Sequence, residues 1–191
     1  MDILPKRLSK IPFTLEKAIS LGMTKYALSI MMAQGVLERM TRGIYRANEA
    51  ETDGDAEEAY RLASLHCGEE SAICLISALD HYGLTDTIPK KTWILVPHTK
   101  RTTAKKIKLI RCRQPKWDVG IIHRKGYSIT SIERTLVECL LYKRIVGADV
   151  ALRALKTALQ KKVTTLGKVY DAAKHLEVEH RIREVIEVLS V

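Results

Sequence analysis

The sequence predicts an α+β protein of two domains, a small one over residues 1–50 and a larger one over residues 56–191. Three observations predict this organisation. Apolar residues recur at helical spacing near both ends of the chain, and short apolar runs typical of strands lie in the middle. An acidic stretch with few large apolar residues separates the two parts. With a single Phe in 191 residues, the core is built mainly from Leu, Ile, Val and Ala, which favours helices.

Two short helices are expected at the start of the first domain. Thr14 can cap the first helix and Thr24 the second, which would run from Lys25 to about Gln34. Gly22 ends the first helix and leaves only a tight turn between them. Because a short turn holds the second helix at a steep angle to the first, this pattern predicts a helix-turn-helix.

A basic β-hairpin is expected directly after these helices. Residues 36–39 and 44–46 are typical of its two strands, and Gly43 can take the positive φ that the turn requires. The helices and the hairpin together predict a winged helix-turn-helix, whose second helix enters the major groove of DNA. The residues expected to contact DNA lie on this helix and on the hairpin: Lys25, Tyr26, Ser29, Arg39, Thr41, Arg42 and Arg46.

The charge of the chain supports an anionic partner. The formal net charge is +10, and it is unevenly distributed along the chain. Residues 51–88 carry 1 basic and 9 acidic side chains, whereas residues 89–125 carry 12 basic side chains and 1 acidic one. A winged helix can also be a protein-docking or dimerisation unit, but three hairpin arginines favour DNA, since phosphate neutralisation contributes much of the binding free energy. Part of the basic zone at residues 89–125 could form a second contact with DNA, or it could be a solvated loop. The residues concerned are Lys100, Arg101, Lys105, Lys106 and Lys108.

The second domain is expected to begin with helices, continue as a small sheet and end in helices. An acidic linker at residues 48–58 leads into a helix over 56–66, and another helix is expected over 71–82. Thr130 and Glu133 have the spacing of a capping box that opens a further helix, with three more helices after it. The expected strands are residues 93–96, 107–111 and 120–123.

No pattern indicates catalysis or a bound metal. The four cysteines form no CxxC pair, so we expect buried, reduced thiols. Glu133 and Glu138 are interpreted as surface charges or as part of an ion pair. The chain has no nucleotide-binding glycine motif and no zinc-protease motif, and we expect no enzyme activity, no cofactor and no metal. Four residues come nearest to a set of metal ligands, but only the first two of them are close in the sequence, whereas a zinc site usually has close pairs from two segments: His66, Cys67, Cys74 and His81.

Targeting and membrane signals are likewise not expected. The first six residues, Met-Asp-Ile-Leu-Pro-Lys, do not resemble a signal peptide, and no stretch approaches the roughly 20 apolar residues of a membrane span. We therefore predict a cytoplasmic protein without a membrane partner.

Four segments together resemble the AbiEi family, the antitoxins of bacterial type IV toxin-antitoxin systems. The segments are Gly35–Arg39, Arg42–Arg46, Ser77–Thr85 and Ser131–Cys139, and their order is more specific than any one of them. The resemblance implies a repressor that binds inverted repeats in its own promoter through the N-terminal domain. It also implies a second domain that counters a nucleotidyltransferase-type toxin without forming a stable complex with it, often in phage defence.

Two other functions remain as alternatives. The first is a plain transcriptional repressor whose second domain dimerises or senses a ligand. The second, less favoured, is an enzyme that processes nucleic acid. An adjacent gene for a nucleotidyltransferase-like protein would distinguish the antitoxin from the plain repressor.

Overall fold

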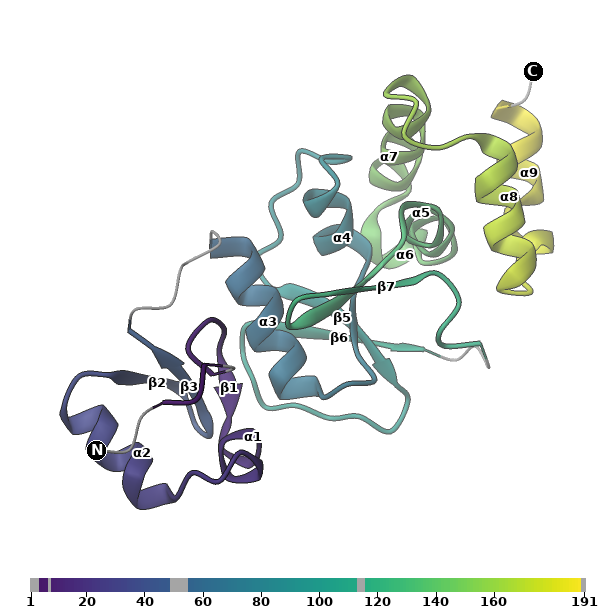
Figure 1. The fold of residues 1–191 in the computed structure, drawn as a ribbon. Coiled ribbons are helices and arrows are strands. Elements are labelled where there is room, and N and C mark those ends of the chain that lie inside the picture. The colour runs from purple at the N-terminus through teal and green to yellow at the C-terminus, as the bar shows by residue number, and fades with distance from the viewer. Residues whose placement is uncertain (1–3, 7, 49–54, 113–115, 190–191) are drawn as a thin grey trace. The chain divides into compact units, whose positions relative to one another are not determined.

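The computed structural model describes residues 4–6, 8–48, 55–112 and 116–189 (Figure 1). The chain is an α+β protein, as predicted. It divides into two compact units, Met1–Glu69 and Glu70–Val191. The boundary therefore lies later than the one expected from the sequence, because a helix assigned to the second domain belongs to the first unit. Part of the expected acidic linker, residues 49–54, lies outside the described residues.

In its described residues, the first unit combines three helices with a three-stranded antiparallel sheet of order β1-β3-β2. Strand β1 was not predicted from the sequence, and it pairs through Phe13 with Tyr45 of β3. The elements are β1 (Phe13–Thr14), α1 (Leu15–Ser20), α2 (Lys25–Ala33), β2 (Leu37–Thr41), β3 (Ile44–Ala47) and α3 (Asp55–Cys67).

Local sequence signals account for most of the first unit. The side chain of Thr14 accepts a hydrogen bond from the Lys17 N–H at 3.2 Å, and that of Thr24 accepts one from the Ala27 N–H at 3.0 Å, so both predicted caps are confirmed. Gly43 has a φ of +81°, as the predicted turn requires. These signals act within a few residues, which is why the sequence alone could reveal them.

Contacts with the hairpin explain why α3 belongs to the first unit. The Arg46 guanidinium pairs with the Glu58 carboxylate of α3, and the Thr41 hydroxyl lies 3.3 Å from Nε2 of His66, near the end of the same helix. The helix is thereby held to the hairpin at both ends. Glu58 was expected to be the last residue of the acidic linker, and it is part of α3.

The second unit contains a mixed five-stranded sheet of order β6-β5-β4-β8-β7. Strands β5 and β6 are parallel, as are β4 and β8, and the other two pairs are antiparallel. The strands are β4 (Ala72–Ile73), β5 (Thr92–Pro97), β6 (Ile107–Cys112), β7 (Ile121–Arg124) and β8 (Tyr127–Thr130).

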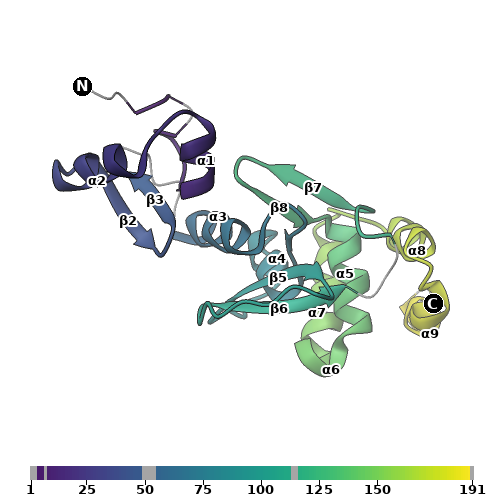
Figure 2. The ribbon, with the colours of Figure 1, turned by 90° about the horizontal axis from the view of Figure 1, so that it is seen from below.

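Helix α5 occupies the centre of the helical part of this unit. It contacts all the other helices that follow the sheet as well as α4 (Figure 2). Apolar side chains of β5 and β6 complete the same core. The helices are α4 (Leu75–His81), α5 (Ile132–Leu141), α6 (Lys143–Val146), α7 (Ala148–Gln160), α8 (Leu166–His175) and α9 (Glu179–Leu189). Within the described ranges, no helix is both long and apolar enough to span a lipid bilayer.

Two expectations for this unit are wrong at their boundaries. The helix expected over residues 71–82 begins only at Leu75, because Ala72 and Ile73 form β4 and pair with β5 and β8. The helix cap expected at Thr130 is instead Ser131, which accepts a hydrogen bond from the N–H of Arg134 at 3.2 Å. In both cases pairing with distant strands overrides the local pattern.

Candidate nucleic-acid interface

The exposed face of α2 carries three of the residues predicted to contact DNA. The helix buries Ala27, Leu28 and Met31, as its amphipathic spacing requires. The opposite face leaves Lys25, Tyr26 and Ser29 exposed, and 76% of Tyr26 is accessible. The sequence of α2 contains no acidic residue, so no carboxylate of this helix offsets Lys25.

The hairpin after α2 carries two exposed arginines. Arg39 lies on β2, where its Nε donates a hydrogen bond to the backbone carbonyl of Thr41 at 3.3 Å. Arg42 lies in the turn before Gly43 and is also exposed. Helix α2 packs directly against β2, so one small core supports both the helix and the hairpin.

Two predicted contact residues have partners within the protein instead. The half-buried Arg46 forms ion pairs with Glu38 on the neighbouring strand and with Glu58 on α3. Its positive charge is thereby matched, and its geometry suits holding α3 to the hairpin better than binding a phosphate. Thr41 is half-buried at its contact with His66. The contacts with Glu58 and His66 were not expected from the sequence, because both residues lie on α3, which was assigned to the other domain.

The second set of predicted cations lies between and along two parallel strands of the second unit. Arg101, Lys105 and Lys106 are exposed in the connection from β5 to β6, and Lys100 is half-buried there. Lys108 lies on β6, where its ammonium group sits 3.6 Å from the centroid of the Trp93 ring. Because Lys108 packs on an aromatic face, its role is partly structural.

Glu133 and Glu138, which were interpreted from the sequence as surface charges or ion-pair partners, lie in different environments. Glu133 is half-buried and accepts a hydrogen bond from Thr164 at 2.8 Å. Glu138 is fully buried and pairs with Arg134, whose Nε donates to it at 3.0 Å. Burial raises the pKa of Glu138, and the adjacent guanidinium only partly opposes that shift. A carboxylate enclosed in this way cannot reach a substrate.

Arg134 also connects α5 to the segment before β7. Its Nη1 donates to the carbonyl of Trp117 at 2.5 Å and to the carbonyl of Val119. Of the two interpretations that the sequence left open for Glu138, the structure shows the ion pair, which this residue forms with Arg134 in the interior of the unit. The sequence shows the i, i+4 spacing of the pair, whereas its burial depends on this distant segment.

The thiols are free and buried, as predicted. Burial raises the pKa of both Cys74 and Cys139, which keeps these groups in the unreactive thiol form. Among the residues that the structure describes, no three His, Cys, Asp or Glu side chains lie close enough together to hold a metal ion.

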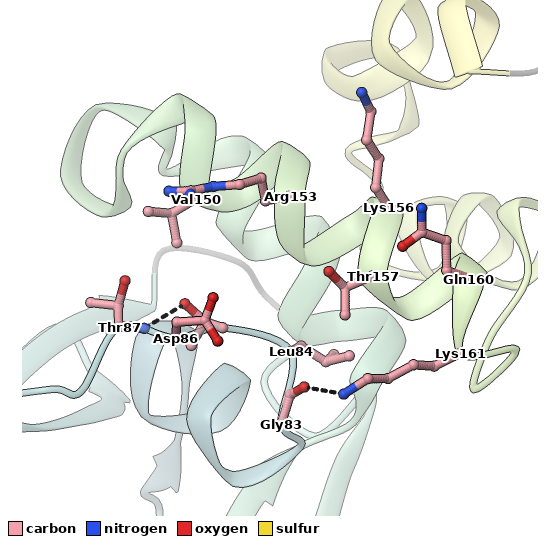
Figure 3. A pocket seen from close by; sticks show the side chains of 11 residues that line it. Gly83, Leu84, Asp86, Thr87, Val150, Arg153, Lys156, Thr157, Gln160 and Lys161 are labelled. Atoms are coloured by element: carbon pink, nitrogen blue, oxygen red, sulfur yellow. Dashed lines mark hydrogen bonds between the residues drawn. The ribbon is translucent and has the colours of Figure 1, made fainter.

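A polar cavity of about 510 Å³ in the second unit was not anticipated from the sequence. It lies between the loop after α4 and helix α7 (Figure 3). The Lys161 ammonium group donates a hydrogen bond to the carbonyl of Gly83 at 2.7 Å across one end of it. Arg153 and Lys156 also line the cavity, with Asp86 as its acidic residue, so it suits a small polar or anionic molecule.

Comparisons with known proteins leave the family open. No protein-family model matches the sequence. No curated protein matches it either. Among solved structures, the RV2827C protein from Mycobacterium tuberculosis is similar at 14% identity and a TM-score of 0.47, with 93% of this chain and 76% of that chain covered. At this level of likeness, the match carries no functional inference.

Proposed function

We propose that this chain is the DNA-binding antitoxin of a type IV toxin-antitoxin system. In this proposal α1, α2 and the β2–β3 hairpin act as a winged helix-turn-helix that represses the protein's own operon. The second unit counters a nucleotidyltransferase-type toxin. The DNA-binding half is supported by the site geometry, and the antitoxin half by the resemblance to the AbiEi family.

The exposed face of α2 carries most of the support for DNA binding. Its first turn presents Lys25, Tyr26 and Ser29, which is the part of a recognition helix that meets base edges. Arg39 and Arg42 on the adjacent hairpin are suited to phosphates or to a minor groove. Such a set of exposed cations without carboxylates on α2 fits a polyanion better than it fits an ordinary protein partner.

We also propose that the basic connection in the second unit contacts DNA. Arg101, Lys105 and Lys106 are exposed and can neutralise phosphates without reading sequence. Lys108 would contribute less, because its ammonium group is held over Trp93. The proposed second contact therefore relies on fewer residues than the five that were predicted from the sequence.

A footprint on the DNA upstream of the chain's own gene tests the repressor half. We expect protection of two inverted half-sites and repression of a reporter gene driven by that DNA. Half-sites read by a symmetric pair of recognition helices lie about one helical turn, or a multiple of it, apart. Absence of a protected region at physiological salt would contradict the proposal.

Co-expression with the cognate toxin tests the antitoxin half. We expect the full chain to restore growth, and we expect a Lys25→Ala/Arg42→Ala variant to restore it equally while failing to repress the reporter. Both substituted side chains are exposed, so the variant should remain folded. Continued toxicity in the presence of the folded wild-type chain would contradict an antitoxin function.

The cavity beside α7 supports a second candidate, a repressor that responds to a small ligand. Lys156 and Lys161 would attract an anionic effector to a site of about 510 Å³, whereas the charge of Arg153 is matched by an ion pair with Asp149. This candidate predicts repression without any effect on the toxin. The co-expression experiment therefore separates the two candidates.

A further inference from the structure

Three apolar residues, which we call the apolar row, lie along the exposed face of α2, next to Lys25. Tyr26, Ile30 and Ala33 occupy positions i, i+4 and i+7, and all three are exposed, with 38% of Ile30 accessible. Positions with this spacing lie on one side of a helix. Ser29 is also exposed, whereas Leu28 and Met31 fill the core behind the row.

The local chemistry favours a DNA groove over a protein as the occupant of this row. Lys25 directly precedes the row and α2 has no acidic residue, while Arg39 and Arg42 are exposed on the hairpin that packs against the helix. A second copy of this chain would present the same cations and would be repelled by them. A polyanion with apolar groups at its centre is complementary to this arrangement.

Such apolar groups exist in the major groove. The C5-methyl group of thymine is the one apolar substituent that base edges present there, and it is read by apolar side chains. From Tyr26 to Ala33 the helix rises by about 10 Å, which corresponds to roughly three base pairs of duplex. The row therefore has the length and character to meet several successive base edges.

We propose that Tyr26 and Ile30 read thymine methyl groups in the major groove, so that the recognised half-sites contain A·T pairs opposite the middle of α2. This inference rests on the proposed DNA-binding function. It adds a specificity that phosphate contacts alone do not provide, because phosphates are the same in every sequence. Lys25 would lie beside the methyl-reading row, towards a phosphate or a guanine.

The test compares two versions of the DNA upstream of the gene, one with thymine and one with uracil, which lacks the C5-methyl group. The full-length wild-type chain should bind the uracil duplex more weakly, by about fourfold for each buried methyl group. In Ile30→Ala the ratio of the two affinities should fall towards one. Ile19→Ala is the matched control, because Ile19 is an exposed isoleucine on α1, and it should keep the wild-type ratio.

Arg42→Ala separates this inference from the proposed function. It should weaken binding to both duplexes by a similar factor and leave the thymine-to-uracil ratio unchanged, since Arg42 lies in the hairpin turn and not on α2. Equal wild-type affinity for the two duplexes would overturn the methyl readout while leaving DNA binding intact. Binding to neither duplex would overturn both proposals. Self-association of the wild-type chain and of Tyr26→Ala would be compared by sedimentation. If Tyr26→Ala loses self-association but keeps the wild-type ratio of affinities for the two duplexes, a second copy of the chain covers the row and the methyl readout is wrong.

Discussion

Replacement of Glu138 by alanine is expected to lower the free energy of unfolding of the second unit by about 3–5 kcal/mol, the usual cost of leaving one member of a buried ion pair uncompensated. Arg134 and Glu138 are each only 1% exposed, so water cannot solvate the guanidinium once the carboxylate is removed. Urea denaturation followed by tryptophan fluorescence would measure this, because both tryptophans of the chain, Trp93 and Trp117, lie in the second unit.

Glu133→Ala is the matched control, because it removes the same charge from the same helix. Glu133 is half-buried and makes one hydrogen bond to Thr164, so its loss should cost only about 1 kcal/mol. Glu138→Gln should fall between the two, since an amide oxygen can still accept from Arg134. A loss in Glu138→Ala as small as that in Glu133→Ala would show that the buried pair does not hold α5 to the segment at Trp117 and Val119.

The double variant Lys25→Ala/Arg42→Ala is expected to bind the upstream DNA on the order of 100-fold more weakly than the wild-type chain. It removes one cation from α2 and one from the hairpin turn, and neither forms an ion pair with an acidic side chain in the part of the chain that the structure describes. Fluorescence anisotropy with labelled duplex would measure the two dissociation constants.

Lys168→Ala/Arg183→Ala is the corresponding control. It removes the same net charge from exposed positions on α8 and α9 and should leave the affinity within about twofold of wild type. A similar loss of affinity in both double variants would mean that net charge alone governs binding. That outcome would remove the specific role assigned to α2 and the hairpin.

Much of the first unit could be predicted because its signals are local. Thr14, Thr24 and Gly43 act on backbone groups within a few residues, so their pattern in the sequence is sufficient to place the helices and the hairpin turn. Ile19 is an exception. This apolar residue of α1 is 48% exposed, because it lies about 100° around the helix from the buried Ala18.

The central strand of the second unit could not be predicted from local pattern. Ile73 is fully buried and pairs with Ile94 on one side and Ile129 on the other, so β4 exists only because two distant segments meet there. An apolar segment this short is equally compatible with the start of a helix. Strand β8 was missed for the same reason, since its residues precede a helix cap and form a strand through β4 and β7.

At the candidate site, the sequence was sufficient to predict which cations are exposed in some cases, but not which cations have partners within the protein. Lys25, Arg39 and Arg42 are exposed as expected. Arg46, in contrast, is enclosed by carboxylates from β2 and α3, and Lys108 rests on an indole ring. Charge counts cannot distinguish these cases, because whether a cation is available to a ligand depends on partners that only the fold brings near.

The most direct test of DNA binding through α2 and the hairpin is the dependence of affinity on salt. If Lys25, Arg39 and Arg42 neutralise about three phosphates, the logarithm of the binding constant of the full chain should fall linearly with the logarithm of salt concentration, with a slope of about −3 or steeper. The Lys25→Ala/Arg42→Ala variant should have a slope that is shallower by about two. Identical slopes for the two proteins, or no binding of the upstream DNA at low salt, would contradict the proposed interface.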